Sequence, residues 1–153
     1  MHPIRALAAR SGLAIVAALV VSTVPTAAVA EHSTEGTTSF NLQGPNTMEN
    51  ALGQQIAVTG AGAIYEAGHT ATGGGGLVQT DAQGNVVARG RWAATTLLGF
   101  ESGVITIEVT LSPGGAAKSM TIVCGATAGG VTLEGYAAQS GSTLCHDAND
   151  DLG

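Results

Sequence analysis

Residues 72–98 read TGGGGLVQTDAQGNVVARGRWAATTLL, a pattern that predicts a β-hairpin. The central segment, 81–85, has the composition of a hairpin turn, with Gly84 at a position that requires a positive φ. The flanking segments 72–80 and 86–98 are rich in glycine and in residues that favour strands. We therefore expect two antiparallel strands joined by this turn.

Pairing across this hairpin predicts a glycine opposite the single tryptophan. Setting Thr80 opposite Val86 puts Gly74 opposite Trp92, and a shift by one place puts Gly75 there instead. An aromatic ring over a cross-strand glycine covers bare backbone and permits strong curvature of the sheet. The four consecutive glycines are therefore interpreted as a bend in a sheet. They lack the lysine that ends a phosphate-binding loop.

Further strands on both sides extend the hairpin into a meander. In 103–111, Ile105, Ile107 and Val109 alternate with polar residues, so we expect one face of this strand to be buried and the other to be exposed to solvent. The best candidate for a short helix is 47–52. The strands that we expect are 39–42, 55–65, 72–80, 86–98, 103–112, 118–125, 131–136 and a short eighth at 143–145.

A loop predicted at 99–102 sets the next pairing. With this loop, Trp92 faces Val109 on the inner side of the sheet, and Glu108 points outward on the other side. The interior would then be built around one indole and small or branched aliphatic side chains.

The fold class that follows is all-β, an antiparallel meander of seven to eight strands. Such a meander closes as a small barrel or folds over as a two-sheet sandwich. An immunoglobulin-like sandwich would need a core tryptophan between two cysteines, whereas Trp92 precedes both cysteines. We favour the barrel, because five glycines fall inside expected strands, where a coiled sheet uses them: Gly60, Gly62, Gly74, Gly76 and Gly90.

The first thirty residues have the pattern of a secretory signal peptide. Arg5 and Arg10 precede an apolar run at 13–21, and small residues at 28–30 provide a cleavage motif before Glu31. The alternative, a membrane-spanning helix, needs about 20 apolar residues, which this segment lacks. We therefore expect a protein secreted to the extracellular space or the cell envelope. The expected regions are a signal peptide (1–30), a flexible leader (31–38), a single β-domain (39–146) and an acidic tail (147–153).

Charge restricts the partners of residues 31–153. They carry three basic side chains against eleven acidic ones, hence a net charge of −8. Binding to nucleic-acid phosphates or to an anionic membrane surface requires clustered lysine and arginine. We therefore expect neither a nucleic acid nor, after signal cleavage, a membrane as a partner.

Cys124 and Cys145 are the only cysteines, and both follow the expected cleavage point. In an oxidising compartment they predict one disulfide, whose closed loop contributes about 3 kcal/mol to stability. Two free thiols, or a metal site that includes His146, are the alternatives.

Two segments resemble ligand-binding motifs only in part. Gly60-Ala61-Gly62 lacks the third glycine and the helix of a dinucleotide fingerprint. The acidic run at 147–151 begins like a calcium loop, but it lacks the glycine and the bidentate glutamate that complete one. Strand curvature and a solvated acidic tail account for these segments.

The histidines do not lie in a known catalytic or metal-ligating pattern. His32, His69 and His146 share no element at metal-ligand spacing. Catalysis would require His69 together with an acid from another segment, and the sequence has no nucleophile motif. The acids considered for such a site are Glu66, Asp81 and Glu101. We expect no catalytic residues, no metal and no cofactor.

The run 86–95, preceded by the glycines at 74–76 and the turn at 81–85, resembles a recurrent pattern in a family of uncharacterised bacterial secreted glycine-rich β-domains. The likeness extends from about residue 55 to residue 124, and it implies a fold and a secreted location but no activity. In pattern, the glycine-punctuated strands are also similar to those of the dirigent and allene oxide cyclase barrels. No residue carries over from either likeness as catalytic.

These observations predict a non-catalytic binding domain for a small apolar ligand or a cell-surface partner. A cavity beside the indole would hold the ligand, with Trp92, Gly74, Gly76 and Val109 as the binding residues. A cyclase-like or isomerase-like barrel enzyme and a structural interaction protein of the envelope are the alternatives. A buried carboxylate in the interior would favour the enzyme, a packed interior the structural role, and an apolar cavity the binding role.

Overall fold

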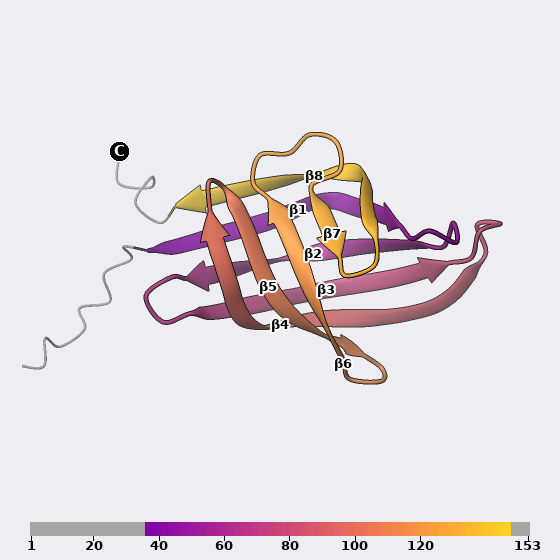
Figure 1. The fold of residues 1–153 in the computed structure, drawn as a ribbon, viewed down its shortest axis with the longest axis horizontal. Coiled ribbons are helices and arrows are strands. Elements are labelled where there is room, and N and C mark those ends of the chain that lie inside the picture. Colours follow the sequence, from indigo (N-terminus) through magenta and orange to yellow (C-terminus); the bar gives the residue numbers. More distant parts are fainter. Residues whose placement is uncertain (1–35, 148–153) are drawn as a thin grey trace, which may run out of the picture. The chain divides into compact units, whose positions relative to one another are not determined.

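The computed structural model describes residues 36–147, which form eight β-strands (Figure 1). The strands are β1 (Thr37–Glu49), β2 (Gln55–Tyr65), β3 (Thr70–Thr80), β4 (Val86–Glu101), β5 (Val104–Ser112), β6 (Ala116–Val123), β7 (Val131–Leu133) and β8 (Ala137–Asp147). Within this range, no helix has the length and apolarity that a membrane span requires. The all-β prediction is confirmed.

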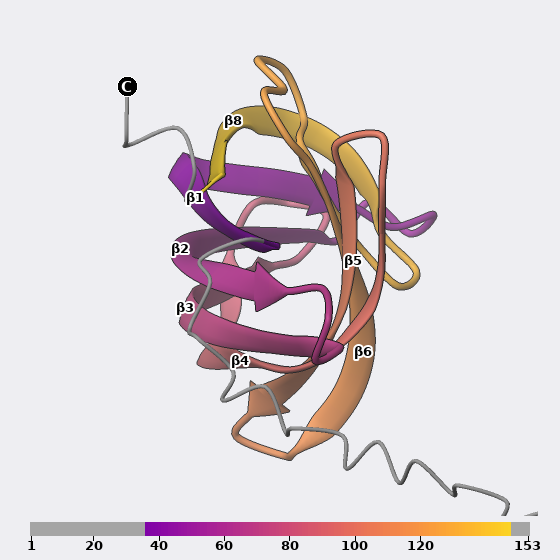
Figure 2. The ribbon, with the colours of Figure 1, turned by 90° about the vertical axis from the view of Figure 1, so that its left-hand side faces the viewer.

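The strands form one antiparallel sheet that curls into a nearly closed barrel. In sheet order they are β7, β6, β5, β4, β3, β2, β1 and β8, so the last strand pairs with the first. Figure 2 shows β5 and β6 on one side of the interior and β1, β2 and β3 on the other. The predicted meander is therefore confirmed, and so is the preference for a barrel over a sandwich.

A seam joins β8 to the segment between β6 and β7. The Gly129 amide donates a hydrogen bond to the Gly141 carbonyl at 2.8 Å. The Cys124–Cys145 disulfide crosses the same seam, so the predicted bridge is confirmed and the free-thiol and metal alternatives for these sulfurs are wrong. A disulfide is consistent with an oxidising, extracellular environment.

Apolar side chains fill the interior of the barrel. In β5, Ile105, Ile107 and Val109 are fully buried, whereas Thr106 and Glu108 are partly exposed, as the alternation predicted. Burial of each such aliphatic side chain contributes about 1.5–3 kcal/mol. The three largest buried side chains are Trp92, Phe40 and Met48.

The first strand, β1, is longer than predicted. We expected a strand at 39–42 and a short helix at 47–52, but β1 continues through an irregularity that contains Pro45. Proline is tolerated in a bulge because no ladder hydrogen bond is lost there. Met48 is fully buried and pairs with Ile56, so packing overrides the local preference. The helix prediction is wrong.

The predicted β3–β4 hairpin forms, but a bulge changes its register. Thr80 pairs with Val86 as predicted, whereas Gly75, not Gly74, pairs with Trp92. The irregularity lies next to the turn and adds one residue to β4. The one-place shift considered from the sequence is therefore the observed pairing.

Close approach of backbones explains the glycines in this part of the sheet. A Cβ added at Gly75 would collide with the carbonyl oxygen of Thr59 on β2. One added at Gly62 would collide with the ring of Phe40, its cross-strand partner on β1. A ring lies against Gly62, and the indole of Trp92 lies opposite Gly75, its cross-strand partner, where it donates to the same Thr59 carbonyl. The glycines serve the sheet, as predicted, and not a phosphate loop.

The β4 strand runs through most of the loop predicted before β5. Ser102 and Gly103 have positive φ values of 51° and 74°, which gives a tight two-residue turn. Two irregularities in the β4–β5 pairing then place Trp92 opposite Leu111 and not opposite Val109. The predicted pairing of Trp92 with Val109 is wrong because the turn comes later in the chain than predicted. From this turn alone Trp92 would face Pro113, and the two bulges bring its partner back to Leu111.

Parts of the predicted regions lie outside the described residues. These are the signal peptide (1–30), most of the leader, and the calcium-like run after Asp147. The leader prediction ends too late, because β1 begins at Thr37. Thr38 is buried, and its hydroxyl donates to the Asp147 carboxylate at 2.7 Å. Asp147 is therefore the last residue of β8 and not the first of a tail.

Asp81 organises the β3–β4 turn. Its carboxylate accepts hydrogen bonds from the backbone N–H groups of Asn85 and Gln83, at 2.8 and 3.0 Å. The Asn85 backbone N–H, followed by the Asn85 side-chain amide, lowers the pKa of Asp81 below its ordinary value of 3.8. A lowered folded-state pKa stabilises the turn above the unfolded pKa, and this stabilisation is lost as the pH falls through the folded value.

We therefore expect the turn to loosen only below about pH 4. Amide chemical shifts of Gln83 and Asn85, followed from about pH 6 to about pH 2, should move together with the protonation of Asp81. Asp81→Asn keeps an acceptor oxygen but cannot titrate, so its turn should give flat shifts over this range. The same pH dependence in both proteins would show that another group controls the turn.

Candidate functional site

Trp92 lies in the packed interior of the barrel. Only 1% of it is exposed, and its indole N–H donates a hydrogen bond to the Thr59 carbonyl at 2.9 Å. Its ring stacks on Phe40, with centroids 6.4 Å apart and planes 22° apart. Because its polar group is satisfied and its ring is packed, Trp92 serves as a core residue.

The four predicted ligand-binding residues do not meet at one site. Trp92 and Val109 are buried in the core, where they belong to different cross-strand pairs. Gly74 and Gly76 flank the partner of Trp92 on β3, so they face the outer side of the sheet. Of the four, Gly76 lines a hollow on the surface.

A hollow of about 520 Å³, termed the outer hollow, lies on the outer face of the sheet over β2, β3 and β4. Successive side chains of a strand point to opposite faces, so Gly76, Val78, Arg89 and Arg91 face away from buried Trp92. Pro45 of β1 also lines the hollow. The lining residues are Pro45, Ala57, Thr59, Gly75, Gly76, Leu77, Val78, Arg89, Gly90 and Arg91.

Small residues on neighbouring strands create the outer hollow. Gly76 has no side chain, and Ala57 and Thr59 on β2 are short. A Cβ added at Gly76 would contact only the Thr59 hydroxyl oxygen, at 3.1 Å, and its φ is not positive. The space above Gly76 is therefore open, and the position can accept a side chain.

Two arginines form one end of the outer hollow. Arg89 and Arg91 are both exposed, and they are two of the three basic side chains in residues 31–153. No carboxylate lines the hollow, and neither guanidinium forms a salt bridge with any residue of 36–147. The outer hollow is therefore a locally cationic site on an acidic chain.

Comparisons of the chain with protein-family models, curated proteins and solved structures gave no match. One barrel architecture carries many unrelated functions, so the fold by itself does not define an activity. The function therefore has to be inferred from the residues that line the surface hollows.

A carboxylate and an imidazole line a smaller hollow elsewhere on the barrel. Glu66 and His69, from the β2–β3 turn, share a hollow of about 170 Å³ with Leu97 and Phe100 of β4. The Leu97 amide donates to the His69 carbonyl at 3.2 Å, which fixes the turn against β4. The hollow is smaller than the roughly 300–1,000 Å³ of typical ligand pockets.

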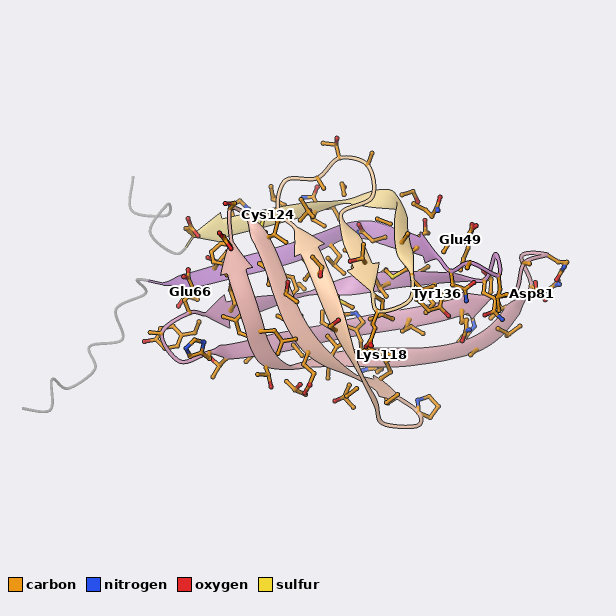
Figure 3. The ribbon with its side chains drawn as sticks, viewed as in Figure 1. Glu49, Glu66, Asp81, Lys118, Cys124 and Tyr136 are labelled. Atoms are coloured by element: carbon orange, nitrogen blue, oxygen red, sulfur yellow. A yellow bond between two sulfur atoms is a disulfide. The ribbon has the colours of Figure 1, made fainter. Side chains whose placement is uncertain are left out.

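The other acids considered as partners of His69 are spread over the barrel. Glu101 lines a separate hollow of about 540 Å³. Asp81 lies at the opposite end of the barrel from Glu66, as Figure 3 shows. Glu108 accepts a hydrogen bond from the Thr95 hydroxyl at 3.1 Å on the outer face, as predicted. Only Glu66 shares a hollow with His69.

Among residues 36–147, one buried polar side-chain atom has no hydrogen-bond partner. The buried polar side chains within 36–147 are Thr38, Asn46 and Thr143, so no carboxylate of these residues is buried. The Asn46 amide donates to the Ser142 carbonyl at 3.0 Å, whereas its side-chain oxygen has no partner. No group of three or more His, Cys, Asp or Glu side chains in the described range could hold a metal.

Sequence reasoning missed the outer hollow as a site. The alternation along β4 places Arg91 on the outer face, and Arg89 two residues earlier shares that face. The strand register that places Ala57 and Thr59 of β2 next to these arginines in the outer hollow could not be predicted from the sequence. Two arginines at alternate positions, opposite a glycine of the next strand, are the signal that would have indicated it.

Proposed function

We propose that residues 31–153 form a secreted, non-catalytic binding domain whose ligand or cell-surface partner docks in the outer hollow. The observation that carries this proposal is a hollow of about 520 Å³ beside two exposed guanidiniums that have no acidic partner within 36–147. Its volume falls in the range of small-molecule sites. Export is supported by the signal-peptide pattern at 1–30 and by the disulfide.

The packed interior supports the outer face as the binding surface. Trp92 is 1% exposed and Val109 is fully buried. A ligand inside the barrel would have to displace such side chains, each of which contributes about 1.5–3 kcal/mol through burial. A ligand in the outer hollow displaces only water. The likeness to secreted glycine-rich β-domains stays a prediction.

A cyclase-like or isomerase-like enzyme is the alternative function, and the hollow shared by Glu66 and His69 is the observation that favours it. A carboxylate beside an imidazole can act as an acid–base pair. Its volume of about 170 Å³ leaves little room for a substrate. A structural role in the envelope is favoured by the packed interior, and it predicts no small-molecule binding in either hollow.

Filling the outer hollow should weaken binding. We expect a panel of small organic molecules, screened by amide NMR spectra, to shift the signals of Ala57, Gly76 and Val78 in the wild-type domain. Gly76→Leu places a side chain in the hollow without backbone overlap, so the fold should be retained. Its Kd for the bound molecules should rise about tenfold or more, which corresponds to about 1.4 kcal/mol.

Gly99→Leu is the matched control. A Cβ added at Gly99 contacts nothing within 4 Å, and Gly99 lines the same hollow as Glu66 and His69. This variant should leave binding in the outer hollow unchanged. Loss of binding in Gly99→Leu but not in Gly76→Leu would favour the enzyme alternative. An absence of shifts with every molecule would favour the structural role.

A further inference from the structure

We infer that the outer hollow binds an amphiphilic anion, with a carboxylate or phosphate head held by Arg89 and Arg91 and a short aliphatic body that extends toward Pro45. This inference rests on the proposed function, because it specifies the chemistry of a ligand at the same site. The juxtaposition of a cationic end and an uncharged apolar end in one hollow is the observation that supports it.

The cationic end can hold a single anionic head. Arg89 and Arg91 are separated by one residue, so their side chains leave the same face of β4 about 7 Å apart. Each guanidinium is a planar fork that matches the paired oxygens of a carboxylate or a phosphate. Neither guanidinium forms a salt bridge with an acid within residues 36–147, so the N–H donors of both are available to a ligand.

The other end of the outer hollow is apolar. Pro45 on β1 and Ala57 on β2 present aliphatic surface there, and Val78 on β3 lies between Ala57 and Arg89, its partners on the two neighbouring strands. Thr59 provides the only hydroxyl group among the lining side chains. No aromatic side chain lines the hollow, so it offers no ring on which a nucleobase would stack. An aliphatic body fits this lining better than a flat or polar one.

The two ends are separated by the width of four strands. Arg91 on β4 pairs with Gly76 on β3, while Thr59 lies on β2 and Pro45 on β1. Neighbouring strands are about 4.8 Å apart, so the distance from β1 to β4 is about 14 Å. A linear ligand with its head at β4 would therefore lie across the strands, over the gap left by Gly76.

Four probes separate the contributions of head and body, with binding followed by amide NMR of the folded domain. Octanoate and octyl phosphate carry both parts, octanol carries only the body, and inorganic phosphate carries only a head. We expect octanoate and octyl phosphate to bind at the outer hollow at least about fivefold more tightly than octanol or inorganic phosphate. The tighter of the two identifies the preferred head.

Removal of the two guanidiniums should erase the preference for a charged head. In the double variant Arg89→Gln and Arg91→Gln, the affinity for octanoate should fall about five- to tenfold and match that for octanol, which should not change. Both arginines are exposed, so the fold should be retained. Lys118→Gln removes a positive charge from β6, away from the hollow, and should leave every affinity unchanged.

Three results would overturn parts of this inference and remain distinguishable. Octanol that binds as tightly as octanoate, or an equal loss in Lys118→Gln, would exclude recognition of an anionic head but leave the outer hollow as a binding site. Inorganic phosphate that binds as tightly as octyl phosphate would exclude the aliphatic body. No amide shift at the outer hollow with any probe would overturn the proposed function as well.

Discussion

Gly75→Ala is expected to lower the free energy of unfolding by about 3–5 kcal/mol. The added Cβ would collide with the carbonyl group of Thr59 on β2, and backbone atoms cannot rotate out of the way. The same carbonyl accepts the hydrogen bond from the Trp92 indole, so a shift of β2 would also disturb the core. Such a loss is a large fraction of the roughly 5–15 kcal/mol that stabilises an ordinary domain. Urea unfolding measures it directly.

Gly76→Ala provides the matched control one residue away. Its Cβ would contact only the hydroxyl oxygen of Thr59, at 3.1 Å, and a hydroxyl can rotate. Replacing glycine inside a strand also removes an entropic cost of about 0.5–1 kcal/mol. We therefore expect Gly76→Ala to stay within about 1 kcal/mol of the wild type. Equal unfolding midpoints for the two variants would contradict the claim that close approach of β2 and β3 requires Gly75.

Replacement of both Cys124 and Cys145 by alanine is expected to lower the free energy of unfolding by about 3 kcal/mol. The bridge links positions 21 residues apart and ties the end of β6 to β8. Without it, the unfolded chain gains conformational freedom, and hydrogen bonds such as that of the Gly129 amide hold the seam alone. Urea unfolding measures the loss, and faster hydrogen exchange at Gly129 reports the opening of the seam.

Reduced wild-type protein separates the covalent link from the packing of the sulfur atoms. Reduction and the double substitution should give the same loss of stability if the link is responsible. A much smaller loss after reduction would assign the effect to side-chain packing. Gly129 exchange that remains as slow as in the oxidised wild type would show that the seam closes without the bridge.

Regular alternation made several strands predictable from the sequence. β2 has the predicted bounds, 55–65, and β5 begins one residue later than expected and ends at the predicted residue, Ser112. The buried positions Ile105 and Ile107 were predicted because side chains along a strand alternate with a period of two. The Cys124–Cys145 bridge was predicted from the number of cysteines and the expected compartment.

Register was harder to predict, because a bulge depends on packing between strands and leaves no signature in composition. One bulge near the β3–β4 turn moved the partner of Trp92 from Gly74 to Gly75. The β4–β5 turn lies at Ser102 and Gly103 and not at 99–102, and together with two bulges this makes Leu111, not Val109, the partner of Trp92. The predicted binding residues depended on the unshifted register, so they are separated in the structure. The outer hollow combines residues of four strands, and their meeting is a property of the assembled sheet.

The pairing of β1 with β8 constrains the order in which the chain can fold. Thr38 and Asp147 are bonded although 109 positions separate them. A polypeptide that emerges amino end first, from a ribosome or through a translocation channel, presents β1 long before β8 is available. In the interval, the outer edge of β1 lacks its strand partner and can be captured by chaperones or by a neighbouring molecule. Closure of the β1 edge therefore waits for the final strand of the chain.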